Sequence, residues 1–284
     1  MARGLEARLA RPADRAALVE RLARLPERNL FLLDLAARLG LPPPAGELRG
    51  EVAAVWRADE VVGIAALRPS VVLDAEAAPE AIDALVPYLD ALGVGLIKSA
   101  RAGVDRAWAA LCRRGRRRAI LDRLETAYAL RRGGARCAAP ARHRARPARV
   151  EDLEALVVAA RESLREEDRP DPFAGDLRSF RRWVKGRVSR ARVVDCEGRV
   201  AFVAYADVQR PEGWLIQGVY TWPAYRRRGF AAAGVADLCR EAFDAGASHV
   251  QLAVVEGNLA ARRLYAGLGF EPFDELRTIL FAEA

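Results

Sequence analysis

The stretch "GWLIQGVYTWPAYRRRGFAAAGVADLCREAFDAGASHVQLAVV" (213–255) decides the fold that we expect for this chain. Its first part, WLIQGVYT, is a β-rich run long enough for a central strand, and Pro223 should end the pairing because proline cannot donate to a ladder. From Val235 apolar residues recur at helical spacing until Gly246, and SHVQLAVV (248–255) is a second strand. Strand, helix and strand predict a right-handed parallel crossover.

The turn between the first strand and the helix predicts an anion site. The first N–H groups of a helix have no acceptor within the helix, and together with the helix dipole they bind phosphate when the backbone can be approached closely. Gly229, Ala231 and Ala232 leave that backbone bare, while the preceding arginines add cationic donors. A diphosphate is therefore expected on residues 227–232.

The passage resembles the GNAT superfamily of acetyl-CoA-dependent N-acetyltransferases. Arg226, Gly229 and Ala231 match its signature [Gln/Arg]-x-x-Gly-x-[Gly/Ala], and "NLAARRLYAGLGF" (258–270) looks like its Asn-x-x-Ala-x-x-Leu-Tyr-x-x-x-Gly-Phe helix. The strong resemblance covers about residues 190–273. It implies acetyl-CoA as the acyl donor and direct transfer of the acetyl group to a primary amine, of a small molecule or a protein.

The resemblance also implies where the donor binds. The first strand should splay from its neighbour after a bulge at Gly218, so that its backbone can pair with the pantetheine amides and one N–H can polarise the thioester carbonyl. No metal is implied. The implied cofactor contacts are Val219, Tyr220, Thr221, Arg226, Arg227, Arg228, Gly229, Phe230, Ala231, Ala232, Asn258 and Tyr265.

Two of these residues have a second interpretation. Tyr265 resembles the residue that protonates the departing thiolate, and the alternative is an amphipathic core residue with its hydroxyl at the rim. Asn258, seven residues earlier and so on nearly the same side of the helix, could serve only as its N-cap.

The general base is not identified by the resemblance. Many members of the superfamily place a glutamate five residues before the asparagine, and here that position is Ala253. Glu256 is near, although it could be a solvated loop residue. The acidic segment 162–176, which includes Glu166 and Glu167, could cover the acceptor groove, attract a cationic amine and supply a base, or could simply be a solvated loop.

The chain reads as two similar halves. A glycine- and arginine-rich linker at 133–144 separates residues 1–132 from residues 145–284, and "RPADRAALV" (11–19) resembles "RPARVEDLEALV" (146–157) with a short insertion. Each half contains a hairpin candidate, at 50–69 and at 190–208. We expect an α/β (α+β) fold of two GNAT-like domains, each a mixed, mostly antiparallel sheet flanked by helices. The first half resembles a degenerate copy, because residues 76–92 are acidic where phosphates would bind.

Composition restricts the remaining possibilities. The longest apolar runs are too short to span a membrane, and the four cysteines lie far apart, which favours a cytoplasmic protein without a zinc site or disulfides. The net charge of +8 comes from residues 113–149, with thirteen arginines against two acids, so general nucleic-acid binding is not expected. A polyanion-binding protein and a non-catalytic acyl-CoA-binding or regulatory protein are the rival functions. A homodimer is left open.

Overall fold

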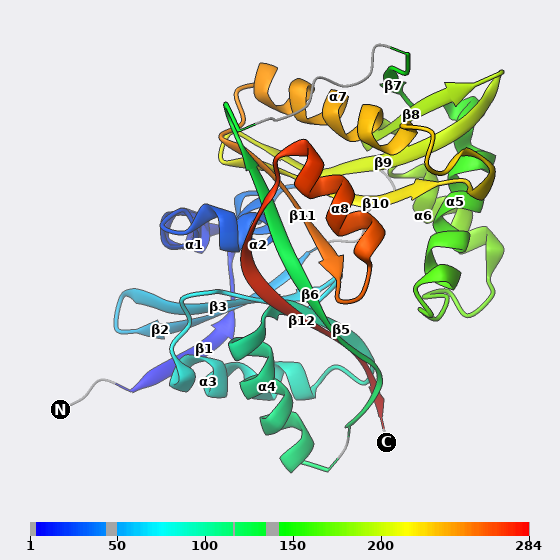
Figure 1. Cartoon of the computed structure of the whole chain (residues 1–284). Helices are drawn as coiled ribbons and strands as arrows, with labels where there is room; N and C mark the ends of the chain where they lie inside the picture. The colour runs from blue at the N-terminus through cyan, green and yellow to red at the C-terminus, as the bar shows by residue number, and fades with distance from the viewer. Residues whose placement is uncertain (1–3, 44–49, 116, 135–141, 284) are drawn as a thin grey trace.

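The computed structural model describes residues 4–43, 50–115, 117–134 and 142–283, and within them the chain repeats one order of elements twice (Figure 1). The elements of the first half are β1 (Leu5–Leu9), a 3₁₀ turn (Pro12–Asp14), α1 (Arg15–Leu22), α2 (Pro26–Ala37), β2 (Glu51–Arg57), β3 (Glu60–Arg68), β4 (Val72–Leu73), α3 (Pro79–Asp90), β5 (Gly95–Ala100), α4 (Arg101–Arg113) and β6 (Arg117–Arg131).

The second half has the same order. Its elements are β7 (Ala145–Pro147), a 3₁₀ turn (Val150–Asp152), α5 (Leu153–Glu166), α6 (Leu177–Lys185), a 3₁₀ turn (Val188–Arg190), β8 (Ala191–Cys196), β9 (Arg199–Arg210), β10 (Gly213–Thr221), a 3₁₀ turn (Pro223–Tyr225), α7 (Phe230–Asp244), β11 (His249–Val255), α8 (Leu259–Leu268) and β12 (Glu271–Glu283). The division of the chain at 132 and 145 remains a prediction, which this repeat supports. Most of the predicted linker lies outside the described residues.

The two halves share one local interaction at the same spacing. Arg8 donates to both carboxylate oxygens of Asp14 at 2.6 and 2.9 Å, and Arg146 donates to Asp152 at 2.7 and 2.9 Å. Each aspartate also accepts the backbone N–H three residues before it at 2.7 Å. The sequences therefore align without the expected insertion, because Arg8 and not Arg11 corresponds to Arg146.

The predicted elements around the site are confirmed. The two hairpins form as β2–β3 and β8–β9, β10 ends before Pro223, and α7 is followed by a left-handed Gly246. β10 and β11 are parallel, as the crossover requires, while most other strand pairs are antiparallel. The result is a mixed, mostly antiparallel architecture.

An exchange of strands joins the two halves. The larger sheet has the order β5-β12-β6-β11-β10-β9-β8-β7, and β1-β2-β3-β4 form a smaller sheet. Thus β6, the last strand of the first half, lies between β11 and β12, and β12 lies between β5 and β6; Figure 1 shows these two long strands crossing the centre of the molecule. The sequence did not indicate this exchange.

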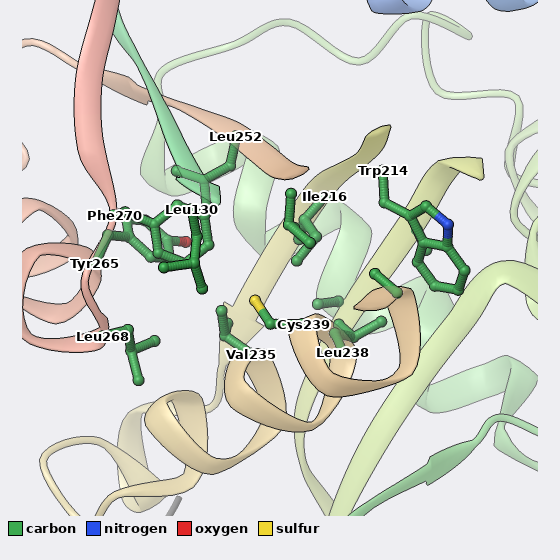
Figure 2. Packing of buried hydrophobic residues seen from close by; sticks show 14 of the residues in the cluster. Leu130, Trp214, Ile216, Val235, Leu238, Cys239, Leu252, Tyr265, Leu268 and Phe270 are labelled. Atoms are coloured by element: carbon green, nitrogen blue, oxygen red, sulfur yellow. The ribbon is translucent and has the colours of Figure 1, made fainter. Parts of the chain in front are cut away.

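Separate apolar clusters cover the two faces of the C-terminal sheet. Side chains of β9, β10 and β11 pack against α7 and α8 in one cluster, which Figure 2 shows around Val235, Leu238 and Ile216. A second cluster on the other face joins Tyr205 and Tyr220 to α5 and α6. The site described next lies where β10 separates from β11 between these layers.

No helix among the described residues is long and apolar enough to cross a membrane. Several arginines of segment 113–149 that the structure describes are bonded to acids: Arg114 to Asp90, Arg123 to Glu125 and Glu167, Arg131 to Glu27, and Arg146 to Asp152 and Asp195. These pairs offset part of the positive charge of the segment.

Candidate active site

Strand β10 opens away from β11 as the sequence predicts. The two strands pair only at Trp214–Val250 and Leu215–Gln251 among the described residues, although β10 continues to Thr221. On its other side the register of β10 with β9 shifts between Gln217 and Tyr220, where Gly218 has a φ of +57°. A bulge therefore diverts β10, and its backbone from residue 216 to 221 faces β11 without pairing to it.

The turn after β10 presents the first N–H groups of α7. Gly229 is the N-cap residue, with a left-handed φ of +87°, and Arg227 is also left-handed at +57°. The N–H groups of Phe230 and the two following alanines have no acceptor within the helix. Ala231 and Ala232 are half-buried, so a ligand can approach this backbone closely.

Aromatic packing fixes the position of this turn. The Phe230 side chain is buried, with 1% of its surface exposed, and it contacts Tyr225 edge-on at 5.6 Å between ring centroids. His143, which precedes β7, stacks on Phe230 at 3.9 Å. Phe230 thus anchors the start of α7 in the core while its backbone N–H remains at the surface turn.

The three arginines of the turn have different environments. Arg226 donates to both carboxylate oxygens of Glu166 at 2.6 and 2.8 Å, and its Nε donates to the Thr221 carbonyl at 2.9 Å. Arg228 lies over the rings of Tyr225 and Phe230. Arg227 is exposed. Arg226 therefore joins the end of β10 to the end of α5, a contact that the sequence did not indicate.

Asn258 and Tyr265 lie on α8 as expected. Asn258 is the N-cap, and its Oδ1 accepts the N–H of Ala261 at 3.0 Å. Tyr265 belongs to the apolar cluster of Figure 2 and stacks edge-on against Phe270 at 5.6 Å. Burial raises the pKa of the Tyr265 phenol well above its usual range. Tyr265 therefore stays protonated at neutral pH, as a proton donor must.

The acidic segment 162–176 is largely neutralised by its own contacts. Glu162 pairs with Arg165, Glu166 with Arg226, and Glu167 accepts from Arg123 at 3.0 Å. Asp171 and Asp176 accept backbone N–H groups of the following turns. The segment therefore offers less free negative charge than its composition suggests.

Glu256 lies just after β11. Its backbone N–H donates to Leu124 at 2.9 Å, and its side chain is exposed. Together with Gly257, Arg101 and Arg277 it lines a depression of about 630 Å³. Among the described residues its carboxylate accepts no hydrogen bond, in contrast to Glu166 and Glu167.

Strand β6 brings two charged residues beside Ala253 that sequence reasoning did not select. Ala253 is opposite Ala127, and Glu125 lies two residues further along β6, on the same face as Arg123. Glu125 is buried; it accepts from Lys98 Nζ at 2.5 Å and from Thr278 Oγ1 at 2.6 Å. Lys98 outweighs burial and lowers the pKa of Glu125 to about 2. A glutamate shortly before the apolar run at residues 127–130 was the available sequence signal.

In the first half, the turn between β4 and α3 corresponds to the turn between β10 and α7. Its backbone N–H groups are hydrogen-bonded to side chains of the protein. The N–H of Ala75 donates to Asn29 Oδ1 at 3.0 Å, and the N–H of Glu76 donates to Asp74 Oδ1 at 2.9 Å. The Ser99 hydroxyl accepts the N–H of Leu73 at 2.7 Å, which joins β4 to β5. These contacts occupy backbone groups that the second half leaves open.

The comparisons with known proteins agree with this geometry. Residues 155–270 match the family model "Acetyltransferase (GNAT) family". A solved structure of a Drosophila protein matches with a TM-score of 0.71 at 16% identity, over 98% of this chain and 99% of that chain. A GCN5-related N-acetyltransferase from Sphaerobacter thermophilus matches with a TM-score of 0.63 at 19% identity, over 98% and 95% of the two chains.

A tandem GNAT protein from the clavulanic acid biosynthesis pathway matches with a TM-score of 0.54 at 16% identity, over 99% of this chain and 98% of that chain. The search of curated proteins gave no significant match. The fold is thus that of a tandem GNAT protein. The match to the GNAT family model covers residues 155–270, the part of the chain that contains β10, α7 and α8, and the general chemistry of that family is acyl transfer from an acyl-CoA.

Proposed function

We propose that this protein is an N-acetyltransferase that transfers the acetyl group of acetyl-CoA to a primary amine of a small molecule or a protein. The opening of β10 next to the uncapped first turn of α7 carries the proposal. A diphosphate on the N–H groups of residues 227–232 would leave the pantetheine to run along the unpaired backbone of Val219, Tyr220 and Thr221. The free thiols of Cys112, Cys196 and Cys239 suit a cytoplasmic protein.

The reaction would proceed by direct attack. The neutral amine attacks the thioester carbonyl, which a backbone N–H of β10 polarises, and the nitrogen then loses its extra proton to water. The C–S bond breaks, and Tyr265 gives its proton to the thiolate and is reprotonated from solvent. A base must first take a proton from the ammonium. Of the three proposed bases, Glu166 and Glu167 already accept from arginines, so Glu256 is the better supported.

Acetyl-CoA binding is tested by Ala232→Asp. Ala232 occupies the third position of α7, where a carboxylate stabilises the helix by about 0.3 to 1 kcal/mol but repels a diphosphate. We expect calorimetry to give an acetyl-CoA Kd raised by roughly 10-fold or more, without a lower melting temperature. The control is Ala245→Asp, the same change at the other end of α7; an equal loss of affinity there would contradict the assigned position.

Catalysis is tested by thioester turnover over a panel of primary amines. Tyr265→Phe and Glu256→Gln should lower kcat by about 100-fold while acetyl-CoA affinity stays unchanged. The second candidate function is a non-catalytic acyl-CoA-binding protein, favoured by Ala253 at the family glutamate position. Tight acetyl-CoA binding without turnover of any amine would favour that alternative.

A further inference from the structure

Around Arg169, which lies within the acidic segment 162–176, three cationic side chains face two acidic ones. On the sheet face that carries Glu125, Lys98 and Arg123 come from β5 and β6, and Arg169 comes from the segment after α5. The acids facing them are Glu125 and Glu167. Lys98 bonds to Glu125, Arg123 bonds to both Glu125 and Glu167, and Arg169 has only a 3.8 Å contact with Glu167, so Arg169 is the least paired of the three cations.

Arg169 is held in place but is poorly paired. Its backbone N–H donates to the Leu164 carbonyl at 2.9 Å, in a Schellman motif in which Asp168 has the left-handed φ of +50°. The side chain is 35% exposed, and its nearest carboxylate, that of Glu167, is 3.8 Å away. Among the described residues no hydrogen bond from this guanidinium is found. Burial lowers the pKa of Arg169, yet a guanidinium stays charged.

The position of Arg169 suits the binding of a negatively charged group of the acceptor substrate near the thioester carbon. Its charged neighbours are Glu167, Arg123 and Glu125. Glu125 is two residues along β6 from Ala127, which is paired with Ala253, and two strand residues span about 6.6 Å. Gln251, Ala253 and Val255 are half-buried on this face, so the sheet between the arginine and the open end of β10 is accessible.

We propose that the acceptor amine carries a carboxylate group, as an amino acid does, and that this carboxylate binds Arg169 with Arg123 of the exchanged strand beside it. A planar guanidinium pairs with a carboxylate through two parallel hydrogen bonds and would hold the amine toward Ala253. The first half would thereby contribute to acceptor recognition through β6. This inference rests on the proposed acetyl transfer and narrows its acceptor.

The test compares amino acids with their decarboxylated amines in the acetyl-transfer assay of the full chain. The wild-type protein should acetylate at least one amino acid with a kcat/KM about 10- to 100-fold above that of its decarboxylated twin. Arg169→Gln should remove this preference by raising the amino-acid KM, leaving kcat and the twin's KM nearly unchanged. Arg165→Gln is the matched control, because Arg165 is exposed and pairs with Glu162.

Unchanged acetyl-CoA affinity and melting temperature verify that Arg169→Gln is folded. Equal turnover of both members of every pair, or a preference that survives Arg169→Gln, would overturn the carboxylate assignment and leave the acetyltransferase proposal intact. Absence of turnover with every amine would remove both.

Discussion

Arg226 has a different role from its two neighbours. It holds the signature position, and its guanidinium is already bound by the Glu166 carboxylate and the Thr221 carbonyl. Thr221 ends the unpaired part of β10, so Arg226 closes the turn on which the diphosphate is expected. In the proposed site Arg227 and Arg228 would instead contribute main-chain N–H groups, and Arg227 has a φ that non-glycine residues seldom adopt.

Glu166→Gln separates two roles for Glu166. If Glu166 acts mainly by occupying Arg226, its neutralisation frees the guanidinium for the diphosphate, and the KM for acetyl-CoA should fall by up to about 5-fold, the range of a half-exposed ion pair. If Glu166 is instead the base, kcat should fall steeply and the acidic limb of the pH profile should move. Steady-state kinetics against Glu162→Gln, whose partner is Arg165, distinguishes these results.

At the scale of elements, the Glu125 carboxylate ties three strands together. It lies on β6 and bonds to Lys98 of β5 and Thr278 of β12. β6 and β12 are the exchanged strands, and β5 pairs with β12. This buried carboxylate therefore stabilises the junction between the halves. The unpaired edge of β10 and the turn before α7 lie on the opposite side of β11 from this junction.

Glu125→Gln should destabilise the protein in a pH-dependent way. Since the pKa of Glu125 is lowered from 4.5 to about 2, the ionised carboxylate stabilises the fold above about pH 4.5, and this contribution is lost as the pH falls toward 2. Urea unfolding at pH 7 should give a loss on the order of 2 to 3 kcal/mol, shrinking below pH 4.5. Glu283→Gln, at an exposed end of β12, should cost less than about 0.5 kcal/mol; a pH-independent loss for Glu125→Gln would refute the linkage.

At the scale of the whole molecule, neither half contains all the strands that its sheet uses. Without β6, the C-terminal half would lose the strand between β11 and β12 and expose two unpaired edges. The first half would likewise lose β12 from between β5 and β6. Each half thus depends on the other, although the element order is complete in each.

Residues 145–284 expressed alone should therefore be insoluble or unfolded. In the full chain, a protease site inserted within the predicted linker 133–144 should allow cleavage without separation, because the β6–β12 pairing holds the fragments together. Size-exclusion chromatography of the cut protein, with circular dichroism of the isolated half, measures both effects. Two separate, folded fragments would show that the exchange is not required for stability.

The sequence was sufficient for features that depend on neighbours along the chain. The strand before Pro223, the bulge at Gly218 and the Asn258 cap follow from the φ/ψ preferences and hydrogen-bonding groups of individual residues. The repeat could also be read from the sequence, although its alignment was off by the expected insertion, which the Arg8–Asp14 and Arg146–Asp152 pairs correct.

Only the tertiary structure decided which distant segments meet. Arg226 and Glu166 are 60 residues apart, and Glu125 reaches Thr278 across 153 residues. The apolar pattern of a strand indicates that it is buried in a sheet but not which strands lie next to it. The sequence of β6 therefore did not indicate that it pairs with β11. The turn that would hold acetyl-CoA was therefore determined by local sequence, whereas the charges around the acceptor were determined by strand exchange.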